Sequence, residues 1–151
     1  MTLATWNVRR LYRPGALAKL KDELTKYGIA ITAFPEIRWS GSEIFDSGDF
    51  IVCYSGNEER RQFGTGFLIN KKYKHLIIGF SPEADRMCSL RIRGIFFNPT
   101  IICVHAPMEE KDEMQKDDFY EDLERIYMKA PKHDIKVVMG ILMQKWVKNH
   151  V

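Results

Sequence analysis

Apolar residues recur along the chain with two different periods, one typical of helices and the other of strands. From Ala16 to Tyr27 they fall every three or four positions among charged residues, and Gly28 follows as a natural stop, which predicts a helix. The segment from Met108 to Met128 shows the same period and predicts a second helix. Short apolar runs rich in β-branched residues predict strands at 2–8, 29–34, 50–54, 64–70, 74–80, 87–93, 95–104 and 135–139.

The order of these elements predicts a layered α/β protein. A strand, a helix and a strand open the chain, a mainly β middle follows, and a helix and a strand come last. The 151 residues contain no internal repeat or linker, so we expect one domain or part of one.

Composition and charge narrow the function classes only slightly. The hydrophobic content of 45% and charged content of 28% are typical of globular proteins, and a net charge of +3 permits a nucleic-acid partner without indicating one. No apolar run approaches membrane-spanning length, so we expect an intracellular protein of the nucleus or cytoplasm without membrane contact. The three cysteines lie in apolar runs, which favours buried reduced thiols over a disulfide framework.

Two polar residues follow predicted strands closely enough to suggest a site. Pro35 cannot donate to a sheet ladder, so the strand before it should end there and leave Glu36 at its carboxyl end. Asn7 stands in the same position at the end of the first strand. A carboxylate is a suitable Mg²⁺ ligand, and Asn7 could orient it or a metal-bound water. A surface glutamate that begins a loop and an asparagine in a turn remain the alternatives.

Four motifs, in order, resemble those of the endonuclease/exonuclease/phosphatase superfamily. They are Thr5-Trp6-Asn7-Val8-Arg9, Glu36-Ile37-Arg38-Trp39, Gly64-Thr65-Gly66-Phe67 and Val104-His105-Ala106-Pro107. Together with the acidic helix at 109–127, they are most similar to the apurinic-endonuclease-like domain of RTE-type non-LTR retrotransposons.

The resemblance implies a DNase I-like fold, a four-layer α/β sandwich of two facing sheets with helices outside. It also implies Mg²⁺-dependent cleavage of DNA phosphodiesters. Glu36 would then ligate Mg²⁺, Asn7 would hold the metal or the phosphate, and His105 would touch the scissile phosphate. Arg9 and Arg38 would contact the DNA. Pro35 departs from the family pattern, because this branch carries Gln in its place.

A larger departure follows Gly140, where the family continues with Asp-Phe-Asn. This chain has Ile141 and Met143 at the Asp and Asn positions, and neither side chain can bind a metal or take a proton. A codon series for Asp-Phe-Asn-Ala-Lys-Val-Gly, translated one base late, gives Ile-Leu-Met-Gln-Lys-Trp-Val, the residues of 141–147 in order. We therefore interpret 1–140 as a partial domain and 141–151 as a frameshifted tail. A genuine short amphipathic tail is the alternative.

The departure predicts a truncated and inactive endonuclease domain with an incomplete second half. The family's later catalytic residues, including a terminal Asp-His pair, would be missing. We also expect the second sheet and its covering helix to be missing, so that apolar faces of the first half lie bare. Two alternatives stay open. One is a nonenzymatic remnant that binds DNA or protein, with a basic rim formed by Arg9, Arg10, Arg13 and Arg38. The other is an active phosphoesterase with a different substrate.

Overall fold

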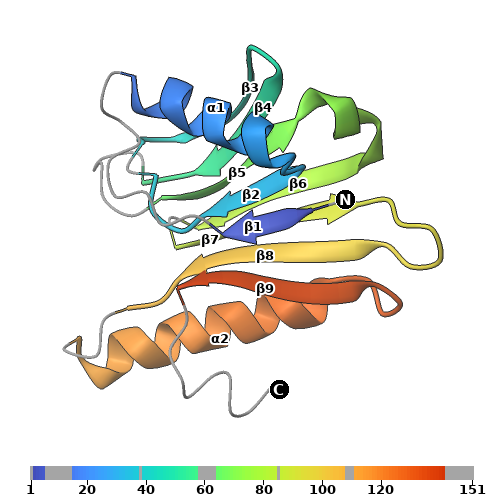
Figure 1. Ribbon diagram of the computed structural model, residues 1–151. Helices are drawn as coiled ribbons and strands as arrows, with labels where there is room; N and C mark the ends of the chain where they lie inside the picture. The colour runs from blue at the N-terminus through green and yellow to red at the C-terminus, as the bar shows by residue number, and fades with distance from the viewer. Residues whose placement is uncertain are drawn as a thin grey trace.

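The elements stack in four layers, a helix, a sheet, a second sheet and a second helix (Figure 1). This computed structural model describes residues 2–5, 15–37, 39–57, 64–84, 86–107 and 111–141. The layering confirms the predicted α/β sandwich.

The first sheet is built from strands that lie far apart in the sequence. Its five strands within the described residues are in the order β1-β2-β5-β4-β3, with β1 parallel to β2 and the other neighbours antiparallel. The strands are β1 (Leu3–Thr5), β2 (Ile31–Phe34), β3 (Ser42–Ser47), β4 (Phe50–Ser55) and β5 (Thr65–Asn70). Helix α1 (Ala16–Tyr27) covers the outer face, because Leu20 and Leu24 pack into one cluster with Phe34 and Leu68.

The second sheet lies behind the first and has its own covering helix. Its four described strands are in the order β6-β7-β8-β9, and β8 and β9 are parallel. The elements are η1 (Lys71–Leu76), β6 (Ile77–Ala84), β7 (Met87–Ile92), β8 (Pro99–His105), α2 (Glu113–Lys129) and β9 (Ile135–Ile141). Phe119, Leu123 and Ile126 of α2 pack on Ile102 and Val104 of β8.

The expectation of a missing second sheet and a missing covering helix is therefore wrong. Strands β6 to β9 already form that sheet, and the apolar stripe of α2 buries its outer face. The acidic start of this helix is exposed, as expected, and Asp112 caps it by accepting a hydrogen bond from the Gln115 N–H at 2.8 Å.

The inner faces of the two sheets form the main core. Alternate residues of β2, β4 and β5 meet those of β7 and β8 there, and Phe67, Leu90 and Ile101 are fully buried. The three cysteines are buried free thiols within this core, as predicted. Burial raises the pKa of Cys53 to about 12, and burial beside Cys103 raises the pKa of Cys88 as well.

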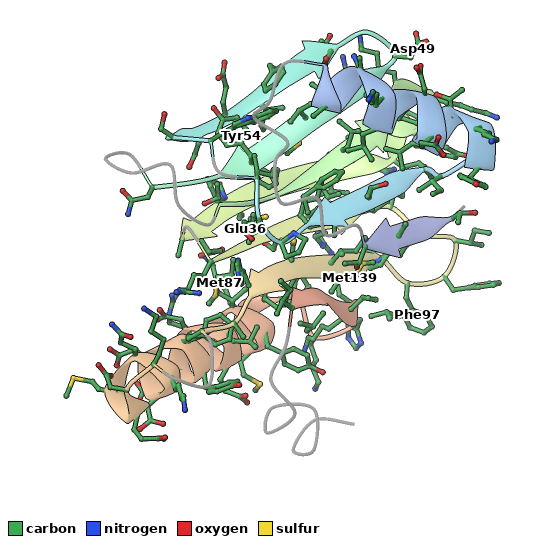
Figure 2. The ribbon with its side chains drawn as sticks, turned by 60° about the vertical axis from the view of Figure 1, so that its left-hand side comes forward. Glu36, Asp49, Tyr54, Met87, Phe97 and Met139 are labelled. Atoms are coloured by element: carbon green, nitrogen blue, oxygen red, sulfur yellow. The ribbon has the colours of Figure 1, made fainter. Side chains whose placement is uncertain are left out.

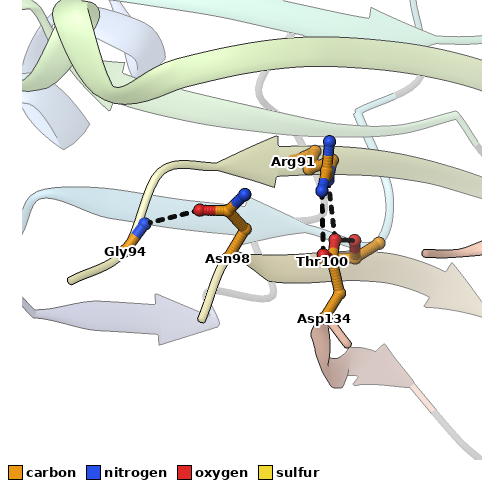
Figure 3. A network of polar contacts seen from close by, with 5 residues as sticks. All are labelled: Arg91, Gly94, Asn98, Thr100 and Asp134. Atoms are coloured by element: carbon orange, nitrogen blue, oxygen red, sulfur yellow. Dashed lines mark hydrogen bonds and ion pairs between the residues drawn. The ribbon is translucent and has the colours of Figure 1, made fainter. Parts of the chain in front are cut away.

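Some strand boundaries differ from those that the sequence predicted. The predicted strand 95–104 begins at Pro99, because Gly94 to Asn98 form a turn in which the Gly94 N–H donates to Asn98 Oδ1 (Figure 3). The predicted strand 74–80 is a 3-10 turn followed by β6, and β3 was not predicted at all. The first strand is described as far as Thr5, and the rest of its predicted range lies outside the described residues.

One polar network anchors the start of β9 to the second sheet. Arg91 donates two hydrogen bonds to Asp134, at 2.7 and 2.9 Å, and the Thr100 hydroxyl donates a third at 2.6 Å (Figure 3). The hydrogen bonds from Arg91 are the largest cause that holds the pKa of Asp134 below its ordinary value, and the bond from Thr100 acts in the same direction. Of the two helices in the described part of the chain, neither is long and apolar enough to cross a membrane.

Candidate functional site

Glu36 lies immediately beyond the carboxyl end of β2, as the sequence predicts (Figure 2). Its neighbours Pro35 and Ile37 are buried, and the Ile37 N–H donates to the Gly64 carbonyl at 2.8 Å. Gly66 allows this packing, because a β-carbon there would overlap the Ile37 side chain and the Cys53 carbonyl. The backbone on both sides of Glu36 is therefore held in place, while its half-buried side chain reaches solvent.

His105 is the last residue of β8, in the opposite sheet. Its side chain is half-buried, and its Nδ1 atom has no solvent exposure. The backbone of His105 is held from two sides, by the β6–β7 turn and by the ladder to β9.

The ends of β2 and β8 meet across the core, which brings Glu36 and His105 to the same edge of the sandwich. The Cys103 thiol donates to the Phe34 carbonyl at 3.3 Å, and each of these residues lies two positions before a candidate residue. Both strands run toward this edge. We call it the rim, and define it by Glu36, Ser55, Gly64, His105 and Ile141, the residues at strand ends there.

Arg86 lies beside the rim, in contact with His105, and the sequence analysis missed it. Its Nη1 atom donates to the His105 carbonyl at 3.0 Å, and its own carbonyl accepts from the His105 N–H at 2.8 Å. The half-buried guanidinium places a positive charge beside His105. The available sequence signal was weak, a single arginine before the strand at 87–93.

Ile141 occupies the strand end directly beside His105. It is the register partner of His105 in the parallel β8–β9 ladder, and its carbonyl accepts from the Ala106 N–H at 2.9 Å. Gly140 before it has φ of 115°, and a β-carbon there would overlap the Val104 carbonyl. An aliphatic side chain therefore lies beside His105 on the β9 side of the sheet.

Several predicted site residues cannot be placed. Asn7, Arg9 and Arg38 lie outside the described residues, as do Arg10 and Arg13 of the expected basic rim. Asn7 was expected near Glu36 because both residues follow strands. The described part of the first strand agrees with this, because β1 is the parallel neighbour of β2 and runs toward the rim.

The described residues do not form a complete metal site. No group of three or more His, Cys, Asp or Glu side chains in this part of the chain is arranged to hold a metal ion. A single carboxylate such as Glu36 suits Mg²⁺ only when substrate phosphates or other ligands complete the shell. A hollow of about 240 Å³ between Arg86, Pro107 and Phe119 is smaller than typical small-molecule pockets of roughly 300–1,000 Å³.

Sequence comparison finds relatives that are much longer than this chain. Craniofacial development protein 2 from Bos taurus and from Tragulus javanicus is 36% identical over 138 residues, or 91% of the chain. The chain spans 23% and 24% of the length of these two proteins. No family model matches the chain.

Comparison with solved structures identifies the fold. The endonuclease domain of TRAS1, a telomere-specific non-LTR retrotransposon, matches 90% of this chain with a TM-score of 0.59 and 17% identity. TDP2 from D. rerio, complexed with single-strand DNA product, matches 96% with a TM-score of 0.65 and 12% identity. An endonuclease/exonuclease/phosphatase family protein from Leptotrichia buccalis matches 93% with a TM-score of 0.59 and 15% identity. The matches cover 56%, 62% and 65% of those chains, so this chain forms part of their fold.

Proposed function

We propose that this chain derives from a DNA endonuclease domain, because it is a homologue of craniofacial development protein 2 with an endonuclease/exonuclease/phosphatase fold. The ancestral domain belonged to a retrotransposon and cleaved DNA phosphodiesters with Mg²⁺. The 151-residue chain itself does not cleave DNA.

The observation that supports this proposal is the rim, where two residues expected from the resemblance lie at neighbouring strand ends and an isoleucine lies where an aspartate is expected. Glu36 and His105 both lie at this rim, and Arg86 adds positive charge that suits a phosphate. Ile141 stands beside His105 at the position where the resemblance expects an aspartate. The isoleucine cannot hold a metal or orient an attacking water.

In the proposed ancestral site, Glu36 and Asn7 held Mg²⁺, His105 contacted the scissile phosphate, and Arg9 and Arg38 contacted the DNA. General acid–base catalysis typically contributes about 10²–10⁴-fold, and loss of one stabilising donor costs about 10²–10³-fold. Because Ile141 can neither take a proton nor stabilise charge at the position where an aspartate is expected, we expect no cleavage above background.

The test is nicking of supercoiled plasmid in Mg²⁺ by the parent chain, with the TRAS1 endonuclease domain as positive control. The parent, Glu36→Ala and Glu23→Ala should all match the buffer. Glu23 is exposed on α1, which covers the outer face of the first sheet, so Glu23→Ala is the matched surface control. Nicking by the parent and by Glu23→Ala, but not by Glu36→Ala, would contradict the proposed inactivity. A contaminating nuclease would nick equally in all three samples.

We also propose that a one-base frameshift produced residues 141–151. Seven consecutive residues, 141–147, agree with a single shifted codon series for the expected family motif. Genomic sequence after the Gly140 codon should continue the lost half in a frame shifted by one base. An in-frame ancestor with unrelated residues at these positions would refute the frameshift.

A further inference from the structure

Three segments form the end of the sandwich that lies opposite the rim. Strands β2 and β8 run from this end toward the rim, and their antiparallel neighbours β5 and β7 run back to it. The segments are η1 (Lys71–Leu76), the turn between β7 and β8 (residues 93–98) and the connection from α2 into β9 (residues 131–136). We call these three segments the distal end.

Backbone hydrogen bonds hold the turn between the other two segments. The Arg93 N–H donates to the Leu76 carbonyl at 2.7 Å, which joins the turn to η1. The Ile135 N–H donates to the Asn98 carbonyl at 3.1 Å, which joins the turn to the connection into β9. Figure 1 shows the turn at the right of the view, next to that connection. The distal end is therefore one continuous surface.

The turn presents a group of apolar side chains to solvent. Ile95 is 94% exposed, Phe96 is 89% exposed and Phe97 is 55% exposed, and Ile135 beside them is 54% exposed. These four are among nine large apolar residues that are exposed in the described part of the chain, so nearly half of them gather here. Single exposed apolar residues are common on protein surfaces, whereas such a group marks an interaction site.

The backbone of the turn is closed tightly. The Gly94 N–H donates to Asn98 Oδ1 at 3.1 Å, and a β-carbon at Gly94 would overlap the Phe97 carbonyl. The apolar side chains are therefore presented on an ordered backbone. An ordered turn loses less conformational entropy on binding than a flexible one.

Basic residues flank the apolar side chains on both sides. Exposed cations are contributed by η1, by the start of the turn and by the connection into β9, namely Lys72, Lys74, Arg93 and Lys132. Lys71 is not counted, because it pairs with Asp46 of β3 at 3.4 Å. Asp134 is the only acidic residue in the three segments, and its buried carboxylate accepts hydrogen bonds from Arg91 and Thr100. The distal end therefore combines apolar side chains with an excess of positive charge.

We propose that the distal end docks on an anionic lipid surface. The apolar side chains of the turn enter the boundary between headgroups and acyl chains, and the flanking cations contact the acidic headgroups. A short apolar insertion or a few cations alone bind a bilayer weakly and reversibly, and the two together give more stable attachment. The inference does not depend on DNA cleavage, because the distal end lies opposite the rim.

The apolar side chains favour lipid over nucleic acid as the partner of these cations. Single-stranded nucleic acid is bound by stacking of its bases on aromatic faces. The most exposed side chain of the turn belongs to Ile95, which has no aromatic face, whereas a bilayer accepts aliphatic and aromatic side chains alike. The short apolar runs that argued against a membrane-spanning segment do not bear on this docking, because an exposed turn binds at the surface without crossing the bilayer.

The test is co-sedimentation of the 151-residue chain with vesicles. One set of vesicles contains phosphatidylcholine alone, and the other contains equal parts of phosphatidylcholine and phosphatidylserine. Binding should be at least about tenfold stronger to the vesicles with phosphatidylserine, because each basic residue near an anionic surface adds to the attraction. It should weaken as the salt concentration rises, because salt screens exposed charges.

An apolar substitution tests the turn. Phe96→Ser removes an exposed apolar side chain and should weaken binding at least about tenfold, because the inserted ring no longer leaves water. Ile44→Ser is the matched control and should bind like the parent, because Ile44 is 58% exposed on β3, outside the distal end. Ile95→Ser is a second variant of the turn, and it decides the question if Phe96→Ser does not fold. Far-UV circular dichroism checks the fold of each variant.

A charge reversal tests the flanking cations. Lys132→Glu should weaken binding to the vesicles with phosphatidylserine at least about fivefold. Lys19→Glu makes the same change of charge at an exposed position in the first turn of α1, outside the distal end. It should change binding less than about twofold, because contact with the headgroups is lost within about one Debye length of the surface.

Three results would overturn the proposal. They are no binding to the vesicles with phosphatidylserine, equal losses in the distal-end variants and their controls, and tighter binding of a single-stranded oligothymidylate that depends on Phe96. The last result would identify the distal end as a nucleic-acid surface instead.

Discussion

Leu123→Ala tests whether α2 truly covers the second sheet. Leu123 has no solvent exposure and packs against Ile102, Val104 and Phe119, which lie on β8 and on the same helix. The substitution removes three carbon atoms, worth about 2.4 kcal/mol of transfer free energy at about 0.8 kcal/mol each. The remaining cavity raises the expected loss to about 3–4 kcal/mol, within the usual range of about 2–5 kcal/mol.

The assay is urea unfolding followed by circular dichroism and by tryptophan fluorescence. A loss of about 3–4 kcal/mol is a large part of the roughly 5–15 kcal/mol that stabilises a typical domain, so the midpoint should fall sharply. Met114→Ala is the control on the same helix, because Met114 is 74% exposed, and it should change the free energy of unfolding by less than about 0.5 kcal/mol. Equal effects of the two substitutions, or a loss below about 1 kcal/mol for Leu123→Ala, would refute the packing of α2 on this sheet.

Two further predictions concern titratable groups. In the native protein at pH 8, the three buried thiols should not react with a disulfide reagent. The thiolate is the reactive form, and burial raises the pKa of Cys53 to about 12. All three thiols should react in urea. Rapid reaction without denaturant would contradict their burial. Asp134→Asn should destabilise the protein at neutral pH, because Arg91 and Thr100 hold the Asp134 pKa below its ordinary 3.8. The difference from the parent in urea unfolding should be constant above about pH 5 and shrink as the pH falls through the native pKa of Asp134. A difference that grows toward acid would show that the network does not stabilise the carboxylate.

The elements with a clear local pattern were predicted well. Helix α1 was predicted at Ala16–Tyr27 and occurs there, because its apolar stripe and the terminal Gly28 are local signals. Strands β2, β4, β5, β7 and β9 also lie within a few residues of their predicted ranges. The exposed β3 has only a weak alternation of apolar residues, so its sequence resembles that of a loop.

The site was predicted only in part. Glu36 and His105 lie at strand ends because Pro35 and Pro107 limit those strands, which is visible in the sequence. The contact of Arg86 with the His105 backbone joins two segments 19 residues apart, and no local pattern encodes it. The expected roles of Glu36, His105, Asn7, Arg9 and Arg38 remain predictions.

The sequence by itself determined which segments are helices and strands, because hydrophobic period, glycine and proline act over a few neighbouring residues. It also determined that an aliphatic residue follows Gly140. The tertiary structure alone decided that α2 covers the second sheet and that Ile141 lies beside His105. These outcomes depend on side-chain packing between strands that are far apart along the chain, which local patterns do not specify.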